Sequence, residues 1–193
     1  PKVELANYVR SPGGEIATTM VGLQRLGMRT SYAGTFGEDE AGRFGMKSLA
    51  DQGIGLKFAD VIAGAETQIA FIVIDQKTGE RTVIWKRDEK LRVTANSAPI
   101  SAVKDCRIVH MTPHDTEACI RLAAAARAAS VPVSLDIDNV FDGIETLLPL
   151  VDILIVGSEF PRKLLGIDDT QQALEILASK YGNALVGVTR GAL

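Results

Sequence analysis

The order of strand-like and helix-like segments constrains the fold of this chain more than any other feature of its sequence. From Thr30 onward, short apolar runs alternate with helical patterns, which is typical of an α/β sandwich with a mostly parallel sheet. The run Asp152–Val156 is expected to be a central strand, because central parallel strands are buried on both faces. The other expected strands are Thr30–Thr35, Arg107–Met111, Val131–Asp136 and Ala184–Thr189. Helices are expected at Asp39–Gln52, Thr116–Ala129, Asp142–Leu150, Glu159–Leu165 and Thr170–Tyr181.

One stretch departs from this alternation. Residues Thr67–Asp88 contain two β-rich runs with no helix between them, which predicts an antiparallel hairpin. Val3–Arg10 alternates apolar and polar residues and is expected to join it, forming a small antiparallel sheet beside the α/β domain over residues 1–193. Both faces of the hairpin are apolar over Ile69–Ile74, and each needs a cover. One face is expected to cover a ligand and the other to meet a second copy of the chain, as a homodimer.

Length, charge and composition exclude several classes of protein. The 193 residues suit one domain, and a net charge of −3 without a cluster of Lys and Arg argues against a nucleic-acid partner or an anionic membrane. No apolar run reaches the length of about 18 residues that a membrane-spanning helix needs, and the first residues lack a signal-peptide pattern. We therefore expect a cytoplasmic protein. Because the sequence starts with Pro and stops just after an expected buried strand, we also expect a fragment.

A pair of glycines, Gly13 and Gly14, comes directly before a helical pattern that carries Ile16, Met20 and Leu23 on one stripe. Glycine allows a close approach of the backbone to a ligand, and the start of a helix presents free N–H groups. The pair is therefore either a ligand-facing turn or a tight structural turn. The surrounding residues match neither GxGxxG nor GxxxxGK[ST], which argues against a dinucleotide site and a P-loop.

Several motifs taken in order resemble the ribokinase-type (PfkB) sugar kinase family. They are the Gly13-Gly14 turn, the helix end Arg25-Leu26-Gly27, the pattern Gly37-x-Asp39-x-x-Gly42, and the later stretches LVDILIVGSEFPRKLLG and GVTRGA. The resemblance covers essentially the whole chain. It implies a ribokinase-like three-layer sandwich in which the hairpin is a β lid. It also implies phosphorylation, with ATP and Mg²⁺, of a primary hydroxyl of a sugar or related polyol.

The resemblance also implies roles for particular residues. The sugar side is expected to comprise Gly13, Gly14, Glu15, Thr18, Thr112 and Asp136, and the nucleotide side Ser158, Glu159, Thr189 and Gly191. Glu15 and Thr18 stand where the family often has asparagine, so the identity of the sugar stays open. Glu15 either hydrogen-bonds a polyol or faces the positive end of its helix. Glu159 either acts on magnesium through water or occupies the first turn of a helix, and Asp39 is interpreted as a helix cap.

The catalytic residue is not expected within this sequence. In the resembled family the base is an aspartate in a glycine-alanine-glycine-aspartate motif, which does not occur here and is expected beyond Leu193. The chain is therefore expected to be inactive as given. A nucleoside kinase of the same family and a non-catalytic sugar- or nucleotide-binding module are the alternatives, and a downstream motif of this kind would favour a kinase.

Overall fold

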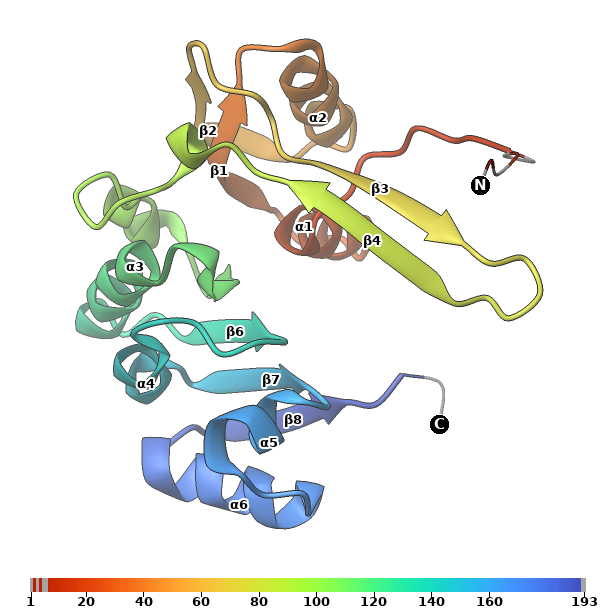
Figure 1. Ribbon diagram of the computed structural model, residues 1–193. Coiled ribbons are helices and arrows are strands. Elements are labelled where there is room, and N and C mark those ends of the chain that lie inside the picture. The colour runs from red at the N-terminus through yellow and green to blue at the C-terminus, as the bar shows by residue number, and fades with distance from the viewer. Residues whose placement is uncertain (1, 3, 5–6, 192–193) are drawn as a thin grey trace. The chain divides into compact units, whose positions relative to one another are not determined.

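The computed structural model describes residues 2, 4 and 7–191 (Figure 1). The chain divides into two compact units, residues 1–91 and residues 92–193, and each unit is described by itself. A single domain over the whole chain stays a prediction.

Unit 1 begins with a small parallel α/β arrangement. Its elements are α1 (Glu15–Arg25), β1 (Ser31–Gly37), α2 (Glu40–Asp51) and β2 (Gly55–Ile62), and both helices pack against β1. Strands β1 and β2 are parallel, and the core between sheet and helices contains Met20, Phe36, Leu49 and Ile54. The expected first strand and the helix after it are confirmed, whereas β2 was not predicted.

The predicted hairpin is present and comes next in unit 1. Strands β3 (Ile69–Ile74) and β4 (Arg81–Lys86) are antiparallel and pair from Ile69 opposite Lys86 to Ile74 opposite Arg81. Its turn is held by the Asp75 carboxylate, which accepts hydrogen bonds from the Lys77 and Thr78 N–H groups at 2.7 and 2.9 Å. A short 3-10 helix, η1 (Glu89–Leu91), follows β4.

The third strand expected at Val3–Arg10 is not seen in residues 7–10, which belong to no strand. Residues 3, 5 and 6 of that prediction lie outside the described residues. One reason is visible at Arg10, whose guanidinium pairs with Glu40 at 2.6 Å and stacks over the Phe44 ring at 4.6 Å from its centroid. These contacts hold Arg10 against α2 instead of against the hairpin.

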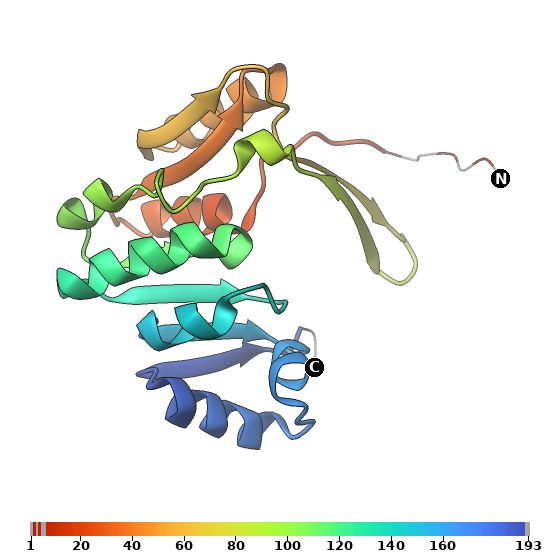
Figure 2. The ribbon, with the colours of Figure 1, turned by 60° about the vertical axis from the view of Figure 1, so that its left-hand side comes forward.

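Unit 2 contains a four-stranded parallel sheet in the order β5-β6-β7-β8 (Figure 2). The strands are β5 (Val109–Met111), β6 (Val133–Ile137), β7 (Ile153–Gly157) and β8 (Leu185–Thr189). The helices are α3 (Thr116–Ala128), α4 (Ile144–Leu147), α5 (Phe160–Leu165) and α6 (Thr170–Tyr181), with 3-10 turns η2 (Ile100–Asp105), η3 (Pro113–Asp115) and η4 (Leu148–Leu150). The prediction of a central strand at Asp152–Val156 is confirmed by β7, which lies between two parallel neighbours.

The core of unit 2 follows from the alternation of side chains along its strands. Val133, Leu135 and Ile137 of β6 are buried, whereas the intervening Ser134 and Asp136 are half-buried. The buried side chains pack with those of the helices, including Ala123, Leu147, Phe160 and Leu177. The helices thus cover one face of β6, and the polar residues lie on the other. None of the helices in the described part of the chain is long and apolar enough to cross a membrane.

Candidate functional site

The two glycines before α1 differ in what their surroundings require. Gly14 is the N-cap of α1 with φ +103°, a backbone conformation that favours glycine. Gly13 has no positive φ, and a Cβ atom added to it would meet nothing within 4 Å. The backbone therefore explains the glycine at position 14. Neither φ nor crowding by neighbouring atoms explains the one at position 13.

Glu15 and Thr18, the other predicted sugar-side residues of unit 1, lie in the first turn of α1 and are exposed. The Thr18 N–H donates to the Gly14 carbonyl at 2.9 Å, so the helix starts directly at the turn. The structure thus brings Gly13, Gly14, Glu15 and Thr18 together at one helix start, where free N–H groups and a partial positive charge suit hydroxyl or anionic ligands.

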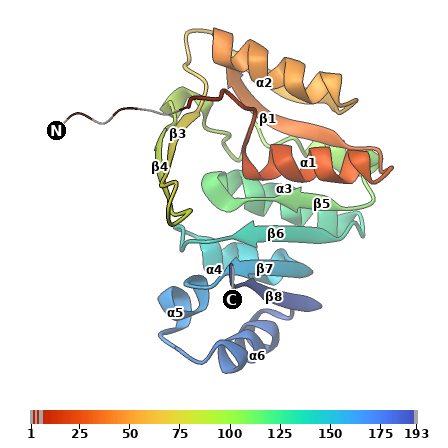
Figure 3. The same ribbon diagram turned by 90° about the vertical axis from the view of Figure 1, so that its right-hand side faces the viewer.

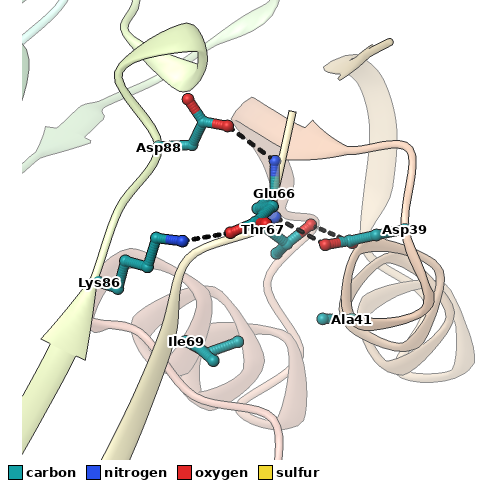
Figure 4. A pocket seen from close by; sticks show the side chains of 7 residues that line it. All are labelled: Asp39, Ala41, Glu66, Thr67, Ile69, Lys86 and Asp88. Atoms are coloured by element: carbon teal, nitrogen blue, oxygen red, sulfur yellow. Dashed lines mark hydrogen bonds and ion pairs between the residues drawn. The ribbon is translucent and has the colours of Figure 1, made fainter. Parts of the chain in front are cut away.

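A second polar group lies where β1 ends and α2 begins, and Figure 4 shows it from close by. The Asp39 carboxylate accepts hydrogen bonds from Gly42 N–H at 2.7 Å and from the Thr67 hydroxyl and N–H at 2.6 and 2.8 Å. The prediction that Asp39 caps this helix is confirmed. The hydrogen bonds from Thr67 and Gly42 lower the pKa of Asp39, the Thr67 hydroxyl contributing most.

An open pocket of about 340 Å³ lies beside this group, at the root of the hairpin. It is lined by Asp39, Ala41, Glu66, Thr67, Ile69, Lys86 and Asp88. Lys86 forms an ion pair with Glu66, which raises the pKa of Lys86, and Asp88 accepts a hydrogen bond from Glu66 N–H at 2.9 Å. Sequence reasoning missed this group, because only the cap at Asp39 has a local signal.

The remaining predicted residues lie along one edge of the unit 2 sheet. Thr112 follows β5, Asp136 is near the end of β6, Ser158 and Glu159 follow β7, and Thr189 ends β8. The strands are parallel, so their carboxyl ends share one edge, and ligands bind at such edges in open α/β sheets. His110 of β5 lies opposite Ser134 of β6 in this sheet, and its Nδ1 is 3.1 Å from the Ser134 hydroxyl. Burial lowers the pKa of His110.

At the predicted nucleotide side, Glu159 is the N-cap residue of α5, directly before its first turn, and forms an ion pair with Arg162 at 2.8 Å. Gly191 follows β8 with φ +64°. Within the described residues, no three His, Cys, Asp or Glu side chains come together to hold a metal ion. Magnesium bound with a nucleotide needs only one or two carboxylates beside phosphates and water, and Glu159 fits that more modest requirement.

The structure thus groups the predicted residues in two sets. Gly13, Gly14, Glu15 and Thr18 lie together in unit 1 at the start of α1. Thr112, Asp136, Ser158, Glu159, Thr189 and Gly191 lie along the carboxyl edge of the sheet in unit 2.

The architecture defines the class of this protein as ribokinase-like α/β. A protein of known structure from Agrobacterium tumefaciens superposes with a TM-score of 0.86 at 24% identity, covering 99% of this chain and 64% of that chain. A fructokinase from Xylella fastidiosa gives a TM-score of 0.77 at 23% identity, covering 100% of this chain and 66% of that chain. At these identities the likeness shows the fold alone.

The sequence identifies the family. Residues 1–193 match the pfkB family of carbohydrate kinases, and the chain belongs to that family. It is 28% identical over 173 residues to Probable fructokinase-6, chloroplastic, of Arabidopsis thaliana, covering 79% of this chain and 44% of that protein. It is also 28% identical over 109 residues to Fructokinase-1 of Zea mays, covering 55% of this chain and 33% of that protein. The chain thus spans less than half of the length of either relative.

Proposed function

We propose that this chain supplies the acceptor side and part of the nucleotide side of an enzyme that transfers phosphate from ATP to a primary hydroxyl of a sugar or related polyol. The family supports the reaction class. A fructokinase from Vibrio cholerae of the same fold, 19% identical to this chain, has been solved with fructose, ADP and a calcium ion. The observation that carries the proposal is Gly13, a glycine at a helix start that neither its φ angle nor neighbouring atoms require.

On this proposal the start of α1 receives the acceptor. The backbone of Gly13 and Gly14 approaches the sugar closely, and Glu15 and Thr18 offer oxygen atoms to its hydroxyl groups. In unit 2, Thr112 and Asp136 are the proposed sugar-side residues, and Ser158, Thr189 and Gly191 contact the nucleotide. Glu159 acts through water on magnesium, which supplies charge neutralisation at the phosphates when bound.

The chain by itself should not catalyse the transfer. Phosphoryl transfer needs a base oriented on the attacking hydroxyl and donors for the developing charge, and loss of one donor alone costs about 10²–10³ in rate in other enzymes. The glycine-alanine-glycine-aspartate motif, which in the family supplies both, is not in this sequence. We therefore propose that the 193 residues bind ligand without turning it over.

We further propose a homodimer through the hairpin. Phe71, Ile74, Ile84 and Trp85 are all exposed by more than half, and apolar strand surface of this kind favours association. A cytoplasmic location also stays a prediction.

The test substitutes Gly13. We expect Gly13→Val to weaken the binding of the acceptor sugar in calorimetry with a panel of hexoses, pentoses and nucleosides, because the new side chain occupies the space of the ligand. Gly22→Val is the matched control, since it also stands in open space, but on the exposed side of α1. Equal affinities for the two variants would return Gly13 to a structural role.

A coupled ADP-release assay, run on the full-length gene product and on the 193-residue chain, tests whether the catalytic base lies outside these residues. Comparable turnover by both would contradict the proposal that the base lies outside these residues.

A further inference from the structure

The hairpin β3–β4 has little to hold it except its root. Every residue of both strands is exposed, and the extensive contacts of β3 and β4 are with each other. Figure 3 shows the hairpin on the side of unit 1 from which α1 begins. Because packing along the strands does not fix its direction, the direction must be set where the hairpin leaves the rest of unit 1.

The segment that leads into β3 is held at Thr67. The Thr67 hydroxyl accepts a hydrogen bond from Gly37 N–H at 2.9 Å and donates one to Asp39 Oδ1 at 2.6 Å. The Thr67 N–H donates to Asp39 Oδ2 at 2.8 Å. One threonine is therefore joined by three hydrogen bonds to the turn between β1 and α2, and the charge on the acceptor strengthens two of them.

This contact leaves no space for side chains at the neighbouring glycines. A Cβ atom on Gly37 would lie 2.7 Å from Thr67 N and closer still to the Ala65 carbonyl oxygen. On Gly42 it would lie 2.8 Å from Thr67 Oγ1 and still nearer to the Gly37 carbonyl oxygen. The backbone segments are thus in close contact, which makes the joint stiff.

The segment that follows β4 is joined by hydrogen bonds and an ion pair to the segment that leads into β3. Asp88 accepts from Glu66 N–H at 2.9 Å and from Lys90 N–H at 3.0 Å, and Lys86 pairs with Glu66. Lys90 Nζ also donates to the Gly64 carbonyl at 2.7 Å. The two segments therefore form one body, which is joined to the start of α2 at Thr67 and to β1 at Leu91, whose carbonyl accepts a hydrogen bond from the Thr35 hydroxyl at 2.5 Å.

We propose that Asp39 and Thr67 form a clamp that sets the direction of the hairpin relative to α2, and that Asp39 is a positioning residue. The inference rests on the proposed function only for its consequence, which is that the hairpin is held ready to cover the acceptor sugar. Its physical content is independent of any ligand. Loss of the clamp frees the hairpin as a unit and leaves α2 folded.

The variants separate the clamp from the helix cap. In Asp39→Asn the remaining oxygen still accepts from Gly42 N–H, but the new NH₂ group faces the Thr67 N–H, and two donors repel. Glu40→Gln is the matched control, because it removes the same charge one residue later, where the carboxylate pairs with Arg10 at 2.6 Å. Thr67→Val removes the hydroxyl at nearly constant volume, and Thr67→Ser restores it.

Trp85 is the only tryptophan in the sequence, lies in β4 and is 58% exposed, so its fluorescence reports on the hairpin alone. The experiment measures time-resolved anisotropy of Trp85 and hydrogen exchange of the amides in residues 67–88 and in α2, at a concentration where all variants share one oligomeric state. We expect Asp39→Asn and Thr67→Val to add a nanosecond motion at Trp85 and to speed exchange in the hairpin by about tenfold. Glu40→Gln and Thr67→Ser should behave as the unmodified chain.

Two outcomes would overturn the inference. One is unchanged anisotropy and exchange in the hairpin of both Asp39→Asn and Thr67→Val. The other is equal acceleration in α2 and in the hairpin, which would assign Asp39 to general stability. Because neither readout uses sugar or nucleotide, failure here leaves the proposed function standing, and failure of sugar binding leaves the clamp standing.

Discussion

The substitution Gly42→Ala should destabilise unit 1, although alanine is the better helix former. Gly42 is the third residue of α2, where replacing glycine by alanine would by itself add about 0.5–1 kcal/mol of stability. The new Cβ atom would lie under 3.0 Å from the Gly37 carbonyl oxygen and 2.8 Å from Thr67 Oγ1. The first of these neighbours is backbone and cannot rotate away.

The net effect follows from the two opposing magnitudes. Overpacking of a tightly packed site costs about 1–3 kcal/mol, and more where backbone must move. Because the Gly37 backbone must move, the upper end of about 3 kcal/mol applies, and subtracting the helix gain leaves a loss of about 2 kcal/mol, which lowers Tm by about 4–8 °C in a chain of this size. Loss of the Asp39–Thr67 hydrogen bonds would add to this value.

Gly22→Ala provides the matched control, because Gly22 lies inside α1, is exposed, and has nothing within 4 Å of its added Cβ. The same substitution there should raise the stability by about 0.5–1 kcal/mol. The assay is urea unfolding followed by far-UV circular dichroism, with hydrogen exchange of α1 and α2 to assign the loss to unit 1. If Gly42→Ala proves as stable as Gly22→Ala, the close contact between Gly37, Gly42 and Thr67 is wrong.

Two further predictions concern acid and association. Hydrogen bonds from Thr67 and Gly42 lower the pKa of folded Asp39, so its contribution to stability is present above the unfolded pKa of about 3.9 and is lost as the pH falls through the folded pKa. The urea midpoint should therefore drop less between pH 5 and pH 2 in Asp39→Asn than in the unmodified chain, and equal drops would contradict this assignment. The exposed Phe71 and Ile84 should support a dimer, which light scattering at micromolar concentration would detect. Phe71→Lys should shift the dimer to monomer, whereas Tyr8→Lys, at another exposed position, should not. A soluble monomer of the unmodified chain would count against this prediction.

Most of the fold could be predicted because each element carries its own signal. The apolar run of β7, the stripe of α1 and the cap of α2 are local patterns, and all three elements lie where they were expected. Strand β2 was not predicted, because a register shift in its pairing with β1 sets Ser31 opposite Gly55 but Ala33 opposite Phe58. Three steps along β2 thus match two along β1, which breaks the period of two that reveals a strand.

The candidate site was predictable only where its residues are neighbours in the sequence. The Gly13-Gly14 turn comes directly before its helix, and the predicted polar residues of unit 2 lie at or just after the ends of its strands. Thr67 lies 28 residues from Asp39 in an irregular segment, and no local pattern connects the two. The pocket beside them depends on this pairing, so only the fold could reveal it.

The pattern Gly37-x-Asp39-x-x-Gly42 gains a different meaning from this contact. As a motif it is typical of the family. In this structure the two glycines allow the backbone segments to lie in close contact, and the aspartate accepts the hydrogen bonds from Thr67. A non-catalytic binding module would need the same three residues to hold its hairpin. The pattern therefore supports the fold without deciding for catalysis. At Gly13 neither the φ angle nor neighbouring atoms require glycine, and the comparison of Gly13→Val with Gly22→Val tests whether a ligand does.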